Sequence, residues 1–223
     1  MPPEIAGETG KENQMKLYDF KGAPNPRRVR MYMAEKGISM PTQEIDLMAR
    51  EQHEDAFRAV NPWCTVPVLK LDDGTHICEA MTIIRYLEAI QPEPPLLGTT
   101  PVEQATISMW EHKLEVDAML AVGEVLRNSI HRFAGRALPG PVDHEQIPAL
   151  AERGRKRIAY FMELLEERLG ESEHVGGADF SVADITALVA VDFAARVVEG
   201  LLDSHPNVQR WHESVSARPS AQA

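Results

Sequence analysis

Two neighbouring segments carry residues suited to binding a small peptide with carboxylates. The first is Val66-Pro67, where a proline interrupts a short apolar run that otherwise predicts a strand. Proline has no backbone N–H and belongs at a break in a sheet, where a cis bond would expose the backbone groups of Val66 to an extended peptide. The second is Glu79, at a predicted strand-to-helix junction, where free N–H groups favour a carboxylate. The alternative is a simple hairpin and helix with a proline at the sheet edge.

The elements that position these residues follow from the local pattern. Residues 66–71 are rich in β-branched side chains, Asp73-Gly74 is typical of a two-residue hairpin turn, and residues 75–78 predict a second strand. From Glu79 the apolar spacing changes to that of a helix. Upstream, the sequence predicts strands at 16–20 and 42–47 and helices at 25–37 and 50–59, the first with Asn25 as N-cap and Pro26 as its first residue.

The rest of the chain predicts helices. Residues 91–101 contain four prolines and form the clearest linker. Ser181 and Asp184 have the spacing of a capping box at the start of a buried helix. Apolar residues recur at helical spacing over 102–122, 149–169 and 206–217, with a break expected at Gly123, a loop at 138–141 and a loose tail from Arg218.

Composition narrows the classes of function. The net charge is −11, from 34 acidic and 23 basic residues, which disfavours nucleic acid and anionic membranes as partners. No apolar run has membrane-spanning length, and we expect no signal peptide. Two cysteines are too few for a disulfide scaffold, so we expect a reducing, cytoplasmic location. The histidines show no metal-ligand spacing, so we expect no metal site.

Several motifs in order resemble the glutathione transferase family, from about Lys16 to near Trp211. They are Asn61-Pro62 before Val66-Pro67, Glu79-Ala80-Met81-Thr82-Ile83 with Tyr86-Leu87, and the Ser181-Val182-Ala183-Asp184 helix start. The resemblance implies an α/β thioredoxin-like domain followed by an all-α domain. We expect a tail at 1–14, a glutathione-binding domain at 15–91, a linker at 92–101 and a helical domain with an electrophile pocket at 102–223.

The same resemblance assigns roles to residues of the first domain. Ala23 stands where many members have a serine that donates to the glutathione sulfur, so the side-chain amide and backbone N–H of Asn25 are the favoured partners of the thiolate, ahead of Tyr18. Arg27 and Arg28 are expected to be solvated surface charges. The glutathione-binding positions implied by the family are Gln52, His53, Val66, Pro67, Glu79 and Ala80. Ala80 replaces a serine that normally helps to hold the γ-glutamyl carboxylate.

The resemblance implies a cytoplasmic homodimer that transfers the glutathione thiolate to a small apolar electrophile. Candidates to face this electrophile are Met109, Trp110 and Lys113, although core packing explains the first two almost as well. One alternative is a glutathione-dependent lyase, or a reductase in which Cys64 forms a mixed disulfide. Another is a non-catalytic protein that binds glutathione or apolar ligands. For Cys64 and Cys78 the simplest interpretation is a small buried hydrophobic residue.

Overall fold

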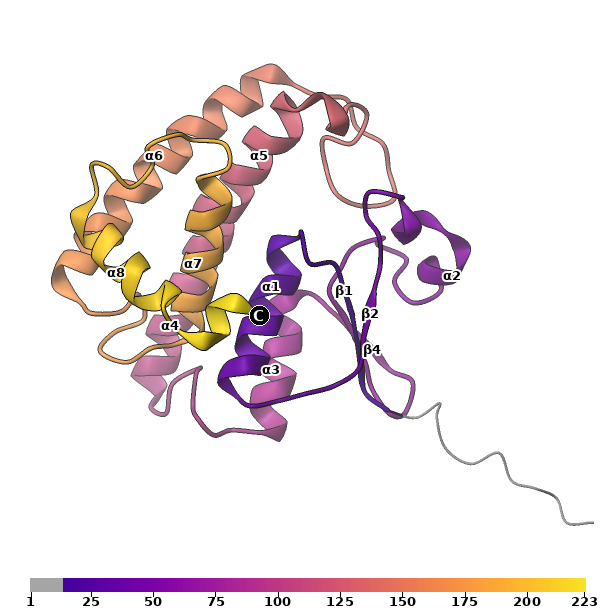
Figure 1. Ribbon diagram of the computed structural model, residues 1–223, viewed down its shortest axis with the longest axis horizontal. Helices are drawn as coiled ribbons and strands as arrows, with labels where there is room; N and C mark the ends of the chain where they lie inside the picture. The colour runs from indigo at the N-terminus through magenta and orange to yellow at the C-terminus, as the bar shows by residue number, and fades with distance from the viewer. Residues whose placement is uncertain (1–13) are drawn as a thin grey trace, which may run out of the picture.

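Four short strands form one mixed sheet in a computed structural model that describes residues 14–223 (Figure 1). The strands are β1 (Lys16–Asp19), β2 (Thr42–Glu44), β3 (Val68–Lys70) and β4 (His76–Cys78), in the order β2-β1-β3-β4. Strand β2 is parallel to β1, whereas β3 is antiparallel to both β1 and β4. The tail expected at 1–14 lies outside the described residues except for Gln14.

Each face of the sheet is buried by different elements because successive side chains alternate between the faces. Leu17 and Leu69 belong to the main core with helices α1 (Pro24–Glu35) and α3 (Ala80–Ile90). On the other face Tyr18 and Val68 pack in a second core with Phe57. This second core lies beside a 3₁₀ turn, Glu51–His53, and the short helix α2, Asp55–Arg58, where the sequence predicted one helix.

The named elements in the remainder of the described chain are all helical, as predicted. Helix α4 (Pro101–Lys113) continues through a π-helical turn (Leu114–Met119) into α5 (Leu120–Ser129). The break expected at Gly123 is wrong, because α5 runs through this glycine and packs along α6, which outweighs the roughly 1 kcal/mol that glycine costs a helix. The other elements are a 3₁₀ turn at His131–Phe133, α6 (Pro148–Glu171), α7 (Val182–Ala194), α8 (Pro206–Ser216) and a 3₁₀ turn at Pro219–Gln222.

Helix α7 lies at the centre of the helical half and begins with the predicted capping box. Asp184 is fully buried and accepts hydrogen bonds from the Ser181 N–H (3.0 Å), the Val175 N–H (2.9 Å) and the Trp211 indole (2.9 Å). The Ser181 hydroxyl in turn accepts from the Ala183 N–H. One carboxylate thus joins the start of α7, the loop before it and α8.

The tail expected to be loose from Arg218 is instead attached to α1. Arg218 donates two hydrogen bonds to Glu35, at 2.8 and 2.7 Å, and Ser220 also donates to Glu35. Ala221 is buried, and its carbonyl accepts from Arg27 at 3.2 Å. The C-terminal turn therefore joins the helical half to the sheet half.

The linker is held by a buried lysine at the end of α1. The Lys36 ammonium group pairs with Glu88 of α3 and donates to the carbonyls of Gln91 (2.9 Å) and Pro92 (3.0 Å). These contacts satisfy the charge that burial would otherwise make costly.

The observed architecture confirms the predicted fold class, a thioredoxin-like sheet domain followed by an all-helical part. The boundaries at 91–92 and 101–102 stay predictions. Among residues 14–223, no helix combines the length and the apolar character needed to cross a membrane.

Candidate functional site

The strand register brings the predicted binding segments to one edge of the sheet. Tyr18 pairs with Val68 and Val68 with Cys78, so the end of β1, the start of β3 and the end of β4 lie side by side. Strand β2 runs parallel to β1 and ends at the same edge, with Asp19 opposite Glu44. Four segments therefore meet at this edge: the start of α1, the loop before β3, the start of α3 and the turn after β2 (Figure 1).

Helix α1 begins at this edge, and no side chain caps its first turn. Ala23 occupies the N-cap position and makes no side-chain cap, so the prediction that Asn25 is the N-cap is wrong. The helix begins earlier because Pro24 fits its first position. Since Pro24 and Pro26 have no N–H, Asn25 supplies the only free backbone donor of the first turn. That N–H, the half-buried Asn25 side chain and the helix dipole are available to an anion.

The Asn25 side chain is held by Arg28, which is not the solvated charge that the sequence predicted. Arg28 is 2% exposed, and its Nη1 donates to Asn25 Oδ1 at 3.1 Å. Its Nη2 donates to Glu111 at 2.9 Å and to Glu115 at 3.0 Å, both from the α4 side of the helical half. Its Nε donates to the Thr186 hydroxyl of α7 at 2.9 Å. Arg27 is also paired, with Asp192 of α7 at 2.5 Å.

Glu111 completes this cluster, although burying its carboxylate is energetically unfavourable. It is 3% exposed, and Oε2 accepts from Arg28 and from the Thr186 hydroxyl (3.1 Å). Its Oε1 is buried and has no hydrogen-bond partner among the described residues. Burial raises the pKa of Glu111 to about 7, although Arg28 and Thr186 act in the opposite direction.

The loop before β3 contains the backbone edge that the sequence predicted. The Val66-Pro67 bond is cis, and among the described residues neither the N–H nor the carbonyl of Val66 has a hydrogen-bond partner. Helix α3 begins after Glu79, which has a φ of 68° and makes no side-chain cap. A non-glycine residue in this conformation is strained, and such residues are concentrated at functional sites. The N–H groups of Ala80 and Met81, the first two of α3, are open, whereas Thr82 N–H donates to the Glu79 carbonyl at 3.1 Å.

Gln52 and His53 lie in the 3₁₀ turn after β2. Gln52 is 8% exposed, and its buried Oε1 has no hydrogen-bond partner among residues 14–223. Burial lowers the pKa of His53, and Arg50 adds to this effect. His53 is therefore neutral at pH 7 and can bind a ligand as a hydrogen-bond donor without adding charge.

The loop between α5 and α6 reaches across to this turn (Figure 1). Arg50 lies 3.9 Å from Asp143, and a Cβ at Gly140 would lie 3.8 Å from the carbonyl oxygen of Trp63. The helical half therefore borders the segments at this sheet edge at two places, through this loop and through α4.

The predicted electrophile residues of α4 do not face Asn25 as a group. Trp110 is buried in the core, with the Arg168 guanidinium 5.5 Å from its ring. Met109 is 52% exposed, and Lys113 pairs with Asp117 at 3.3 Å. Two residues correspond to about 200° of helix, so Met109 and Lys113 lie on the far side of α4 from Glu111. This arrangement disfavours a pocket lined by these residues beside Asn25.

The remaining candidate side chains fit structural roles. Tyr18 is buried and stacks edge-on against Phe57 at 5.9 Å, as expected for a packing residue. Cys64 is buried, and its thiol lies 3.7 Å from the Pro62 carbonyl. Burial and the nearby Glu79 raise the pKa of Cys78, which makes its thiol less reactive.

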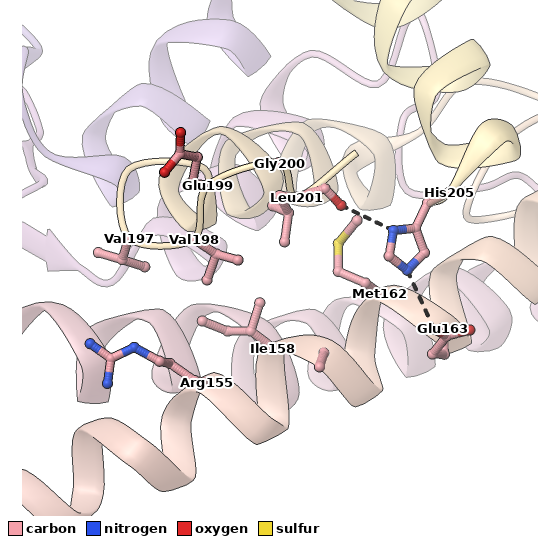
Figure 2. Close-up of a pocket in the computed structure, with 11 residues that line it drawn as sticks. Arg155, Ile158, Met162, Glu163, Val197, Val198, Glu199, Gly200, Leu201 and His205 are labelled. Carbon is pink, nitrogen blue, oxygen red and sulfur yellow. Dashed lines mark hydrogen bonds and ion pairs between the residues drawn. The ribbon is translucent and has the colours of Figure 1, made fainter. Parts of the chain in front are cut away.

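A hollow of about 320 Å³ lies elsewhere, between α6 and the loop that precedes α8 (Figure 2). None of the predicted site residues lines it. Its floor is mainly apolar, and at one end His205 contacts the Leu201 carbonyl (3.0 Å) and Glu163 (3.6 Å). It lacks the free backbone edge and the open helix starts found at the sheet.

Comparison with known proteins agrees with this geometry. Family models described as the N-terminal and C-terminal domains of glutathione S-transferase match residues 23–90 and 131–219. Glutathione S-transferase 2 of Saccharomyces cerevisiae is 33% identical over 96% of this chain and 90% of its own length. The chain belongs to the glutathione S-transferase family. It is thus a transferase, and glutathione is the substrate that this family membership supports.

Two solved structures show the same relationship. A glutathione S-transferase domain-containing protein from Marinobacter aquaeolei is 36% identical, with a TM-score of 0.81, over 92% of this chain and 98% of that one. Gtt2 from Saccharomyces cerevisiae is 32% identical, with a TM-score of 0.81, over 93% and 98% of the two chains. The glutathione S-transferase fold therefore extends across both halves of the described chain.

The sequence did not reveal the cluster of Arg28, Glu111 and Thr186. Arginine in a first helical turn and glutamate in a polar helix are ordinary surface residues. The only available signal was position, because Arg28 lies three residues after Asn25 and so shares its helix face.

Proposed function

We propose that this transferase conjugates glutathione to a small apolar electrophile and that Asn25 stabilises the thiolate. The observation that supports the proposal most directly is the convergence of three open features at one sheet edge. These are the first turn of α1, the free backbone of Val66 and the first turn of α3. A peptide with a thiol and two carboxylates matches this set.

Glutathione would lie extended along the loop before β3. Its cysteinyl backbone would pair with Val66, beside Pro67, and its γ-glutamyl carboxylate would accept from the N–H groups at the start of α3, next to Glu79 and Ala80. Gln52 and neutral His53 would contact the glycyl end. This placement brings the sulfur toward Asn25.

The chemical step needs the thiolate rather than the thiol. A free thiol has a pKa of about 8.5, so only a few per cent is ionised at pH 7. In the absence of a hydroxyl at Ala23, the Asn25 amide, its backbone N–H and the α1 dipole would lower this pKa. The thiolate then attacks an electrophilic carbon, and the leaving group departs with the bonding electrons. The protein contributes by activating the sulfur and orienting both molecules.

The test is an ultraviolet difference titration of glutathione bound to the protein, which follows thiolate absorbance against pH. We expect ionisation near neutral pH in the native protein and a rise of about one pKa unit in Asn25→Ala, equivalent to about 1.4 kcal/mol. Asn207→Ala, an asparagine of α8 that contacts Glu166, is the matched control. No bound thiolate in the native protein at neutral pH would contradict the proposal.

Product analysis separates conjugation from its alternatives. Conjugates formed from aryl or alkyl halides would support a transferase reaction on apolar electrophiles, whereas cleavage of thioethers without conjugation would indicate a lyase. The buried Cys64 and the raised pKa of Cys78 argue against a disulfide reductase. Binding of glutathione without turnover of either substrate class would indicate a binding protein.

We further propose that the protein is a cytoplasmic homodimer. Exposed apolar side chains at the end of α3 and along α4 support a second copy as partner, namely Ile90, Val102 and Met109. Light scattering during gel filtration would give the mass of the assembly, and a monomeric mass at micromolar concentration would contradict a stable dimer.

A further inference from the structure

We propose that Arg28 is a positioning residue that fixes the Asn25 side-chain amide with its NH₂ group toward the glutathione sulfur. The inference rests on the proposed function, in which Asn25 stabilises the thiolate. Its physical basis is the contact between Arg28 Nη1 and Asn25 Oδ1, at 3.1 Å on the same face of α1.

The chemistry of the two side chains decides which end of the amide faces Arg28. Arginine carries only donors, whereas the asparagine amide carries an acceptor oxygen and a donor nitrogen. The oxygen must therefore face the guanidinium group, and the NH₂ group must point away from it. Without Arg28, nothing would fix which end of the amide faces the sulfur, because rotation about the last side-chain bond exchanges the oxygen and the NH₂ group.

Arg28 is well suited to this task because its own position is fixed from two other helices. Glu111 of α4 and Thr186 of α7 accept from Nη2 and Nε at 2.9 Å each. Both are buried, and they are also bonded to each other at 3.1 Å. The planar guanidinium group is thus bound on several sides and has little freedom to follow a movement of Asn25.

The free-energy cost of burying this polar cluster indicates that it has a role beyond a structural ion pair. Glu111 is buried with one oxygen unpartnered, and burial raises its pKa to about 7. Apolar side chains of similar volume generally hold helices together as well as a buried ion pair does. The polar cluster therefore needs another role, and its one contact toward the proposed sulfur site is the bond to Asn25. The helical half would in this way control the sulfur chemistry of the sheet half.

The experiment uses Arg28→Lys, which keeps a positive charge beside Glu111 and loses the Nη1 hydrogen bond to Asn25. In the thiolate titration described above, we expect the pKa of bound glutathione to rise. The rate of conjugation at pH 6.5 should then fall by about tenfold, with little change at pH 8.5. Arg30→Lys is the matched control, because Arg30 lies on the same helix and binds Asp19 rather than Asn25.

A double-mutant cycle with Asn25→Ala tests whether Arg28 acts through Asn25. If it does, Arg28→Lys adds no further rise of the thiolate pKa in the Asn25→Ala background. Equal rises in both backgrounds would show a general structural effect and overturn the inference. If Asn25→Ala leaves the thiolate pKa unchanged, the proposed function itself fails. If only Arg28→Lys leaves it unchanged in a folded protein, this inference alone fails.

Thr186→Val provides a gentler second variant in case Arg28→Lys does not fold. Valine keeps the volume of the side chain and removes the hydroxyl that binds Arg28 and Glu111. We expect a smaller rise of the thiolate pKa in the same direction, abolished in the Asn25→Ala background. An unchanged thiolate pKa in folded Thr186→Val, with a rise in Asn25→Ala, would overturn the inference.

Discussion

Two helices in the helical half of this transferase and two in the sheet half begin in opposite ways. In the helical half, α4 and α7 begin with complete capping boxes, Thr100 with Glu103 and Ser181 with Asp184. In the sheet half, α1 and α3 begin at Ala23 and Glu79 without any side-chain cap. Backbone donors at a helix start must find a partner. A start that the chain closes itself serves stability, and one that it leaves open at a sheet edge is available to a ligand.

The strongest test of this contrast removes the carboxylate of the buried cap. Asp184→Asn should lower the free energy of unfolding by at least about 3 kcal/mol, because several buried donors lose a charged acceptor. Chemical denaturation measures the change. Asp179→Asn, which removes an exposed charge just upstream, should have an effect below about 0.5 kcal/mol. Similar losses in the two variants would mean that the cap does not stabilise the fold.

A hydrogen-bond donor added at the open start of α3 should strengthen glutathione binding. Ala80→Ser introduces a hydroxyl that can donate to the γ-glutamyl carboxylate, a bond worth about 1.5 kcal/mol, so glutathione should bind roughly tenfold more tightly. Calorimetry measures the affinity. Ala59→Ser, at the end of α2, should leave it unchanged. Unaltered affinity in Ala80→Ser would place the γ-glutamyl carboxylate elsewhere.

The Ser181 hydroxyl, which caps the start of α7, should contribute to stability but not to glutathione affinity. Ser181→Ala should cost about 1 kcal/mol of unfolding free energy, while glutathione affinity stays the same. Thermal unfolding and calorimetry on one preparation compare the two quantities. A loss of affinity in this folded variant would contradict the separation of roles.

The smallest expected effect concerns pH. The Asp184 carboxylate, 3.5 Å away, raises the pKa of His174. A raised pKa means that charged His174 stabilises the fold below its unfolded-state pKa of about 6.5, and that this contribution disappears as pH rises through the folded pKa. His174→Gln should therefore cost more unfolding free energy near pH 5 than near pH 9. An equal cost at both pH values would rule out a charged His174–Asp184 pair.

Patterns local in sequence predicted most elements and the closed cap. The Ser181–Asp184 spacing predicted the start of α7, and the apolar face from Ile158 to Leu169 predicted α6, because both depend on neighbours within a few residues. The same holds for the break before β3 at Pro67. The site residues themselves stay predictions, although the strand register brings their segments together.

Features that depend on distant partners were missed. Arg28 is buried by residues 83 and 158 positions away, and the C-terminal turn is ordered by Glu35, which lies 183 positions before Arg218. Gly123 predicted a break, but packing of α5 along α6 keeps the helix intact. Local propensity cannot anticipate these tertiary contacts.

The buried Lys36 ammonium can serve as a chemical probe of linker opening. Amine-directed reagents should modify the exposed Lys156 readily, whereas Lys36, enclosed by Glu88 and the linker carbonyls, should react only when the linker opens. Its labelling rate would then report how often the linker separates from α1, as hydrogen exchange reports local openings. Slower labelling at saturating glutathione would reveal how strongly an occupied site holds the two halves together.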